Sequence, residues 1–284
     1  MVDYDFATDC LFIRNALGLT QSEFAQKIGV SFVMVSHYET GKNAPKAALM
    51  ERVYRLAEDN GISVNLLKTR FLEDDAQGKK LLFHGSRGGI QGEIDLSHGN
   101  PNSDFGIGFY AGETFRQAAT WVNEFPGSSV YCFYFEPTGL KGLNLDVGRD
   151  WMLAVCFFRG YLPGKESHPV MAPLLQRIDN ADYILAPIAD NVMYETLREF
   201  SEGFLTDQQC LHAISANRLG YQYVFRTDKA LGHLEARQRL FLSQNERREY
   251  DDVKHRERNN GIAKLRVARI EYQNKGEYVD AVFA

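Results

Sequence analysis

Cysteine is scarce in this sequence and never occurs in closely spaced pairs. The chain of 284 residues has four cysteines, far apart and each within an apolar stretch. A disulfide framework or a zinc site would need ligands at short, regular spacing, and His98 and His168 also lack such partners. We therefore predict no metal site, and we predict buried free thiols at Cys10, Cys132, Cys156 and Cys210.

Long apolar runs are also missing. A membrane-spanning helix needs about 20 apolar residues, and stretches such as residues 130–135 are far shorter. The N-terminus carries Asp3, Asp5 and Asp9, where a signal peptide would have basic residues followed by an apolar segment. These features predict a cytoplasmic protein with no membrane partner.

The chain has no excess of positive charge. Its formal net charge is −5, with eight basic and eight acidic residues in 1–70 and nine and eight in 243–284. This balance excludes a strongly basic protein that coats nucleic acid. It does not exclude a small DNA reader, because such a reader needs positive charge on one face only.

Composition divides the chain into three parts, and 284 residues at roughly 100 to 200 per domain predict about two domains. Residues 9–60 have the apolar spacing of short helices, whereas the region after a polar run mixes Gly-rich turns, aromatic strands and a few helices. We predict a helical domain over residues 1–70, a larger domain over 79–242 and a charged tail over 243–284. The tail is either a solvated helix or a disordered arm, and its interior Gly261 weakens a single helix.

Two short helices joined by a tight turn are predicted near the N-terminus. Thr20 with Glu23 three residues later is a capping-box pattern, so a helix begins directly after Thr20. Gly29 ends this helix, because glycine adopts the left-handed conformation at a helix C-terminus without strain. Ser31 then caps a second helix that ends at Gly41. This pattern is typical of a helix-turn-helix.

Residues 9–60 resemble the phage-repressor (Cro/XRE) DNA-binding family, through Leu19–Ala25, Ile28–Ser31 and Val35–Gly41. In that family the second helix enters the major groove of DNA, and the proteins usually work as dimers. The resemblance therefore implies DNA as a partner and a homodimer as a further one. It assigns a phosphate contact to Gln21 and a DNA contact to Ser31. It also places four residues at base-reading positions: Phe32, Val33, Ser36 and His37.

An alternative role for the helix-turn-helix stays open at this point. Phe32 and Val33 cannot form the bidentate hydrogen bonds that distinguish bases, and offer only apolar contact, for example with a thymine methyl group. The zero net charge of residues 1–70 predicts a weak phosphate contribution. The alternative is a helix-turn-helix that docks a protein or dimerises.

Two motifs of the larger domain together predict a nucleotide site. A strand leads into His84–Arg87, and twenty residues later comes the glycine turn Gly106–Tyr110. Two glycines one residue apart let backbone approach a ligand closely, although each motif alone is common. Taken together, Leu81–Arg87 and Gly106–Tyr110 resemble the two halves of the NAD site in the ADP-ribosyltransferase superfamily, in its poly(ADP-ribose) polymerase and diphtheria-toxin-like branch.

The third motif of that superfamily is a strand bearing a glutamate, which completes a His-Tyr-Glu signature. The corresponding strand here is Tyr221–Phe225, after a helix predicted over 207–217, and it has Gln222 in place of the glutamate. With Ala189–Tyr194 and Phe225–Leu231, the pattern resembles a bacterial ADP-ribosyltransferase-like family of unassigned substrate. Members of that family are often encoded with small antitoxin-like partners.

The resemblance implies a multidomain fold, an all-α helix-turn-helix domain followed by an α+β ADP-ribosyltransferase-like domain with split antiparallel sheets. It also implies NAD as co-substrate. It assigns a hydrogen bond with the adenosine-side ribose to His84, backbone bonds with the carboxamide to Gly85, and stacking on nicotinamide to Tyr110. Asp104 either fixes the glycine turn or caps it. The further NAD-binding residues that it indicates are Ser86, Arg87, Asp104, Gly106 and Gly108.

Gln222 changes the expected chemistry. Charge-assisted hydrogen bonds contribute about 1.5 to 3 kcal/mol, against roughly 0.5 to 1.5 for a neutral amide, so the reaction would slow about tenfold to thirtyfold. Gln222 can still accept a hydrogen bond from a ribose hydroxyl, but it cannot act as a general base, and a glutamate at 222 should preserve or raise turnover. If Gln222 is not the equivalent residue, Asp190 and Glu195 are the nearest acidic substitutes in sequence.

The sequence thus predicts a mono-ADP-ribosyltransferase with His84, Tyr110 and Gln222 as its catalytic residues. The protein would be a toxin-like or defence effector of bacterial or phage origin, with its own DNA-binding module and an acceptor of ADP-ribose that the sequence does not identify. Two alternatives remain. One is a transcription regulator that senses NAD or ADP-ribose with a degenerate transferase domain, and the other is an NAD glycohydrolase.

Overall fold

The chain forms two compact units, each assembled from segments that lie far apart in the sequence. The computed structural model describes residues 2–189, 191–215, 220–273 and 275–284. No helix within these ranges is both long and apolar enough to cross a membrane. The first unit contains Met1–Gly92, Thr114–Phe135 and Glu235–Asp251, and the second contains Glu93–Glu113, Glu136–Leu234 and Asp252–Ala284.

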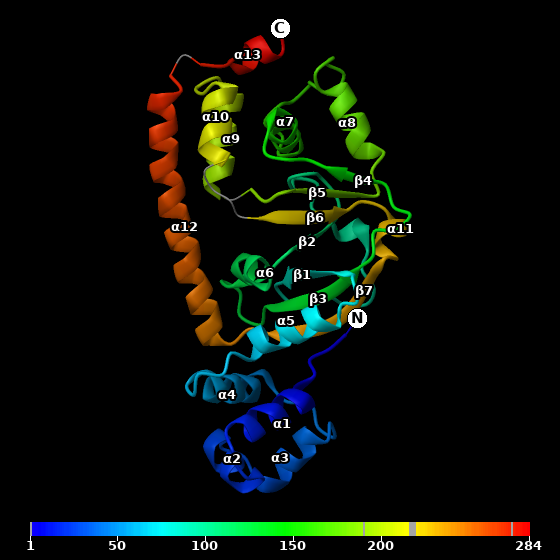
Figure 1. The fold of residues 1–284 in the computed structure, drawn as a ribbon, viewed down its shortest axis with the longest axis vertical. Helices are drawn as coiled ribbons and strands as arrows, with labels where there is room; N and C mark the ends of the chain where they lie inside the picture. The colour runs from blue at the N-terminus through cyan, green and yellow to red at the C-terminus, as the bar shows by residue number, and fades with distance from the viewer. Residues whose placement is uncertain (1, 190, 216–219, 274) are drawn as a thin grey trace. The chain divides into compact units, whose positions relative to one another are not determined.

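Five helices open the first unit, and the second and third form the expected helix-turn-helix (Figure 1). The Thr20 side chain accepts a hydrogen bond from the backbone of Glu23, whose carboxylate binds back to Thr20, which confirms the capping box. Gly29 has a φ of 68° and ends the helix, and Ser31 caps the next one. The helices are α1 (Phe6–Ala16), α2 (Gln21–Ile28), α3 (Phe32–Glu39), α4 (Ala47–Glu58) and α5 (Val64–Asp75).

A buried carboxylate joins three of these helices. Asp9 of α1 is buried and accepts a hydrogen bond of 2.5 Å from the Tyr54 hydroxyl of α4. It also pairs at 2.5 Å with Lys68 of α5. Burying a carboxylate is unfavourable unless it is paired and hydrogen-bonded, so these partners fix how α1, α4 and α5 meet.

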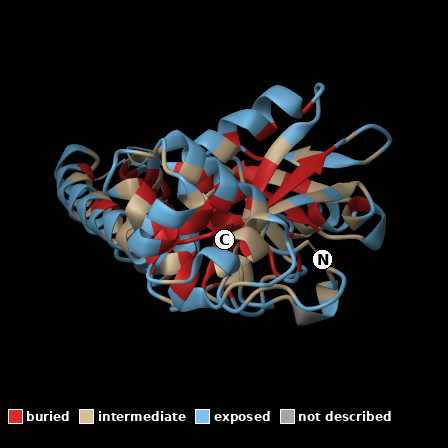
Figure 2. Ribbon diagram, turned by 90° about the horizontal axis from the view of Figure 1, so that it is seen from below, coloured by how far each residue is buried: buried red, intermediate tan, exposed pale blue. Residues whose placement is uncertain are grey.

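The remainder of the first unit is a β layer covered by one helix. The strands β1 (Lys80–Ser86) and β3 (Ser129–Phe135) are antiparallel, and β7 (Leu234–Phe241) lies next to β3. Every residue of β3 is buried, and Figure 2 shows the buried residues of the chain in red. The helix α6 (Phe115–Val122) is capped by the Thr114 side chain and packs its apolar face on β1 and β3.

The helical segment and the β layer of this unit share contacts. Phe241 of β7 belongs to the same buried cluster as the helices, with its ring 5.1 Å from that of Tyr54. The Asn65 side chain of α5 donates a hydrogen bond to the Phe241 carbonyl. The domain limits predicted from the sequence, 1–70 and 79–242, stay a prediction. The predicted boundary between them lies near the end of α5 and the start of β1.

In the described part of the second unit, four strands of mixed direction lie side by side. Its order is β4 (Gly142–Asn144), β5 (Tyr183–Pro187), β6 (Tyr221–Phe225) and β2 (Phe109–Gly112). The β5–β6 and β6–β2 pairs are antiparallel, but the β4–β5 pair is parallel. The α+β class is therefore confirmed. These strand pairs are mainly antiparallel, as expected, and the exception is β5, which returns parallel to β4 after a crossover through α7 and α8.

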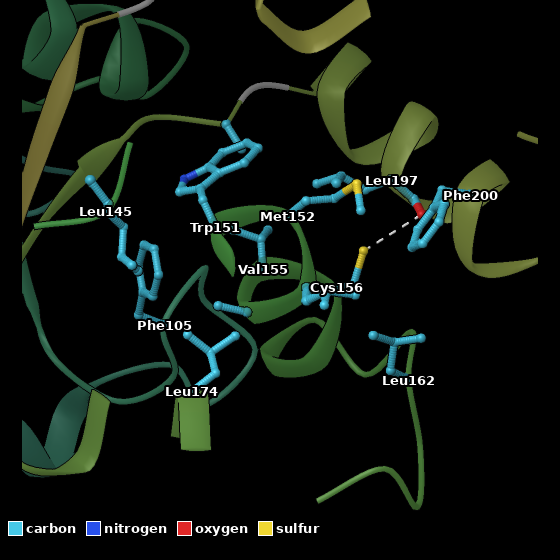
Figure 3. Close-up of a cluster of buried hydrophobic side chains, with 14 of the residues drawn as sticks. Phe105, Leu145, Trp151, Met152, Val155, Cys156, Leu162, Leu174, Leu197 and Phe200 are labelled. Carbon is cyan, nitrogen blue, oxygen red and sulfur yellow. Dashed lines mark hydrogen bonds between the residues drawn. The ribbon is translucent and has the colours of Figure 1, made fainter. Parts of the chain in front are cut away.

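Helices cover one side of these strands (Figure 1). The largest buried cluster lies between these helices and the strands β5 and β6. Its centre is α7, in which residues 151–156 are all buried (Figure 3). All four cysteines of the chain are buried and free, as predicted. The helical elements of this unit are the 3-10 turn η1 (Leu96–His98) and α7 (Arg149–Phe158), α8 (Ala172–Asp179), α9 (Asn191–Ser201), α10 (Asp207–Ser215), α11 (Asp228–Leu231) and α13 (Val279–Val282).

The charged tail contains one long helix, α12 (Gln244–Glu271). Gly261 does not interrupt it, so the expectation that this glycine weakens a single helix was wrong. The buried positions Val253, Gly261 and Ala268 recur at intervals of eight and seven residues, which places them on one face. Packing along this face outweighs the cost of roughly 1 kcal/mol that a glycine imposes within a helix.

The first turn of α12 contains a carboxyl group that favours its proton. Glu246 lies beside Glu58 of α4 and accepts a hydrogen bond from Asn65. Burial, followed by the neighbouring Glu58, raises the pKa of Glu246 to about 8. The folded chain therefore binds this proton more tightly than the unfolded chain does.

We expect the wild-type protein to lose stability as pH rises from roughly 4.3, the ordinary pKa of glutamate, to about 8. A Glu246→Gln variant keeps a neutral group at every pH, so its thermal midpoint should exceed that of the wild type at pH 8.5 and match it more closely at pH 5. The control is Asp252→Asn, at an exposed position of α12 whose carboxylate is not among the groups that raise the pKa of Glu246. An equal difference at both pH values would contradict the assignment.

Candidate functional site

The helix-turn-helix presents two large apolar side chains to solvent. Phe32 and Val33, in the first turn of α3, are 52% and 54% exposed, whereas Ser36 and His37 are half-buried on the same helix. Ser31 is exposed, and its hydroxyl oxygen caps α3 by accepting from Met34 N at 3.3 Å. The structure thus gathers the predicted base-reading residues on one short helix.

Gln21 is partly engaged inside the protein. Its amide nitrogen donates a hydrogen bond of 2.7 Å to the carboxylate of Glu39, which also pairs with Arg14. One of the two amide hydrogens is thereby used to join α2 to α3. The predicted phosphate contact is left to the other hydrogen or to the backbone N–H groups at the start of α2.

The first of the two motifs that predicted a nucleotide site lies in the first unit, at the end of β1. The predicted strand continues further than expected, because His84, Gly85 and Ser86 pair with β3, with His84 opposite Tyr131. A Cβ atom on Gly85 would lie 2.5 Å from the Ala118 carbonyl oxygen of α6, so the absence of a side chain here lets α6 pack on β1. Arg87 is exposed, with its guanidinium 4.1 Å from the centre of the Phe125 ring.

The second motif lies in the second unit, in the loop before β2. The Tyr110 hydroxyl donates a hydrogen bond of 2.7 Å to the Gly106 carbonyl and accepts one of 3.1 Å from Phe105 N. Burial raises the pKa of Tyr110, so the hydroxyl remains a donor. Gly106 has a φ of 73°, and a Cβ atom on Gly108 would approach Val224 of β6 to 2.8 Å. Tyr110 and both glycines therefore shape this loop.

Asp104 is the buried centre of the second unit's polar residues. Its oxygen Oδ1 accepts hydrogen bonds of 2.8 Å from Nη2 of Arg159, at the end of α7, and of 2.8 Å from the hydroxyl of Tyr194 on α9. The guanidinium of Arg159 also lies 3.8 Å from the centre of the Tyr194 ring. The other oxygen, Oδ2, accepts a hydrogen bond of 2.9 Å from Nε2 of Gln222 on β6. Of the two roles that the sequence left open for Asp104, the one that fixes the loop is supported.

Gln222 has an acidic neighbour that the sequence did not indicate. Gln222 is buried on β6, and its partner on the neighbouring strand β2 is Gly112. The neighbouring acid is Asp104, at a distance of 118 positions in the chain. Glu195, named from the sequence, is exposed on α9, and Asp190 lies outside the described residues.

Two members of this cluster, Arg159 and Tyr194, were not among the predicted site residues, although Tyr194 ends the motif Ala189–Tyr194 of the resemblance. Arg159 follows an apolar helix as an ordinary C-terminal arginine, and Tyr194 lies within a helix whose pattern is otherwise amphipathic. Their roles depend on contacts across 55 and 90 positions, and such long-range pairs leave no local signal. Among the described residues, no group of three or more His, Cys, Asp or Glu side chains is arranged to hold a metal ion.

The geometry defines a helix-turn-helix protein with an α+β region whose glycine loop is fixed by a buried carboxylate. Comparison with known families matches residues 12–66 to a helix-turn-helix family, which confirms the N-terminal prediction. Residues 81–236, more than half of the chain, match a family described as protein of unknown function, DUF3990. The chain belongs to this family. No curated protein and no solved structure matches it.

We expect Tyr110→Phe to destabilise the protein by about 1 to 3 kcal/mol, because it leaves Phe105 N and the Gly106 carbonyl without their partner. Chemical denaturation followed by fluorescence measures the loss. The control is Tyr161→Phe, which removes a hydroxyl for which no hydrogen bond is seen among the described residues and should stay within roughly 0.5 kcal/mol of the wild type. Equal effects of the two variants would refute the role of the Tyr110 hydroxyl in fixing the loop.

Proposed function

We propose that this protein reads DNA with α3 and transfers single ADP-ribose units from NAD with its DUF3990 region. The observation that carries the enzymatic part is the meeting of Tyr110, Asp104 and Gln222 in the second unit. Tyr110 and Gln222 lie on paired strands, β2 and β6, and Asp104 is hydrogen-bonded to Gln222. These are residues that the resemblance to ADP-ribosyltransferases assigned to NAD from separate parts of the sequence.

The reaction suits this arrangement. Breaking the bond between nicotinamide and ribose develops positive charge on the ribose, so a site must hold the sugar and place electron-rich oxygen near the charge. In the proposal, the Tyr110 ring stacks on nicotinamide and the Gln222 carbonyl oxygen accepts from a ribose hydroxyl. The NAD roles that the resemblance assigns to His84, Gly85, Ser86 and Arg87, which belong to the first unit, stay predictions.

The DNA-binding part of the proposal rests on the helix-turn-helix match and on the exposed start of α3. Phe32 and Val33 lie where the second helix of such proteins meets base edges, and two solvent-exposed apolar side chains there suit thymine methyl groups. In the cell, the protein would be a toxin-like or defence effector that binds the DNA control region of its own operon. A small antitoxin and a second copy of the chain are the expected protein partners.

A regulator that senses NAD or ADP-ribose is a second candidate, favoured by one observation. Position 222 carries an amide, and the nearby carboxylate of Asp104 is already engaged by Arg159 and Tyr194. No carboxylate is therefore positioned at 222 to act as a base. Binding of NAD without release of nicotinamide would favour this candidate.

The enzymatic proposal is tested by incubating the purified protein with NAD labelled on its adenylate phosphate, with and without cell lysate. We expect nicotinamide release together with label on macromolecules, and protease or nuclease treatment then identifies the class of acceptor. Release without label would indicate an NAD glycohydrolase, and no release would refute the transferase.

Two variants at one position sharpen this test. Tyr110→Ala removes the ring that stacks on nicotinamide and should abolish release, whereas Tyr110→Phe keeps the ring and should retain most of it in a folded sample. Circular dichroism at the assay temperature checks the folding of both. Release that is equal in the two variants would show that Tyr110 does not contact nicotinamide.

The DNA-binding proposal is tested by selecting bound duplexes from a random library and measuring the affinity for the selected sequence. Replacing Phe32 and Val33 together with alanine should weaken this affinity about tenfold or more, because each removes an apolar contact with a base. Phe71→Ala on α5 is the control, since Phe71 is exposed and apolar but lies outside the helix-turn-helix. If no sequence is enriched, the docking or dimerisation role is the better interpretation.

A further inference from the structure

The two groups that face the Gln222 amide nitrogen fix which way this amide points. Nε2 lies 2.9 Å from Oδ2 of Asp104 and 3.3 Å from the carbonyl oxygen of Pro187. A carboxylate and a carbonyl are acceptors only, so the amide must turn its two N–H groups toward them. The reverse orientation would place Oε1 against two other oxygens and leave the amide hydrogens without these partners.

Both acceptors are themselves held in place. The Pro187 carbonyl also accepts a hydrogen bond of 3.1 Å from the indole nitrogen of Trp151, which is fully buried. Asp104 is held by Arg159 and Tyr194 through its other oxygen. Among the described residues no donor is seen to reach Oε1 of Gln222, so this oxygen is the end of the amide that remains for a ligand.

We propose that Asp104 is the positioning residue that makes Gln222 an acceptor, and that Gln222 Oε1 with Asp104 behind it replaces the glutamate carboxylate of related transferases. This inference rests on the proposed function. Donation to a charged acceptor polarises the amide and increases the negative charge on Oε1. The carboxylate thus acts on the ribose through Gln222, while its own charge remains paired with Arg159.

The step itself needs no further reagent. The bond between C1′ of the ribose and the ring nitrogen of nicotinamide breaks, and its electron pair leaves with nicotinamide, which becomes neutral. The positive charge that develops on the ribose is stabilised by Oε1, which accepts from a ribose hydroxyl. A lone pair of the acceptor then forms the new bond to C1′, and the proton of the acceptor passes to solvent.

The same geometry explains why glutamine suits position 222 in this chain. A glutamate would bring a second carboxyl group to within about 3 Å of Oδ2 of Asp104. Two carboxylates at this distance repel each other, so ionising both costs additional free energy. The expectation from the sequence that Gln222→Glu preserves or raises turnover therefore reverses. In this structure the single substitution should lower turnover and stability, increasingly so as pH rises.

An exchange of the two groups tests the inference. Asp104→Asn and Gln222→Glu are made singly and together in the full-length chain, and the double variant keeps one carboxylate and one amide in contact but places the carboxylate at 222. Asp150→Asn is the matched control, because Asp150 also pairs with an arginine of the second unit, Arg177, at an exposed position. Nicotinamide release and thermal midpoints are measured from pH 5 to 8.5.

We expect each single variant to lower kcat for nicotinamide release at least tenfold at pH 8, with KM for NAD changed less than threefold. The double variant should recover to within about threefold of wild type, and its thermal midpoint should exceed those of both single variants. A double variant whose losses equal the product of the single losses would overturn the inference. If Asp104→Asn does not fold, Tyr194→Phe, which removes one donor to Asp104, should lower kcat about threefold, and unchanged kcat would count against the inference.

A measurement without NAD separates this inference from the proposed function. The side-chain NH₂ signals of Gln222 in a nitrogen-proton NMR spectrum should be protected from exchange, and Asp104→Asn or Tyr194→Phe should shift them, whereas Asp150→Asn should not. If these shifts are seen but wild type releases no nicotinamide, the proposed function fails while the positioning by Asp104 stands. If the signals are unprotected and insensitive to Asp104, the positioning fails whatever the activity.

Discussion

The buried carboxylate of Asp104 is the constraint on which the second unit depends. A carboxylate removed from water costs several kcal/mol unless it is paired and hydrogen-bonded. Here the compensating donors come from Arg159, Tyr194 and Gln222, which belong to three different parts of the chain. The end of α7, one face of α9 and the start of β6 must therefore meet at the glycine loop. Once they meet, the loop and the Gln222 amide have a single orientation.

The first unit uses the same physical device for another purpose. Asp9 is buried as deeply as Asp104 and takes its partners from α4 and α5, so it determines how helices assemble around the helix-turn-helix. In both units an apolar core supplies most of the stabilisation, since burial of apolar surface is the dominant favourable contribution to folding. The buried carboxylates add specificity, because they accept a single arrangement of donors. The two carboxylates differ in their surroundings. Asp9 lies among helices that pack through aliphatic and aromatic side chains, whereas Asp104 lies at the predicted NAD site.

Local sequence patterns predicted the elements with strong local signals. Thr20, Glu23, Gly29 and Ser31 act through hydrogen bonds and backbone angles within a few residues, so the two helices and their turn follow directly. The continuation of β1 through Ser86 was missed because it depends on pairing with β3, and the uninterrupted α12 was missed because it depends on packing of the face that includes Gly261.

The sequence by itself determined the helix-turn-helix, the α+β character of the larger region and the membership of Asp104, Tyr110 and Gln222 among the candidate site residues. The first two rest on caps, turns and apolar periodicity, which act over a few residues. The third rests on the resemblance to ADP-ribosyltransferases. Tertiary structure alone decided that Asp104 faces Gln222, that Arg159 and Tyr194 complete the cluster and that Glu195 lies outside it. The physical reason is that a buried charge selects its donors by position in space, and 118 residues of chain separate Asp104 from the amide that it holds.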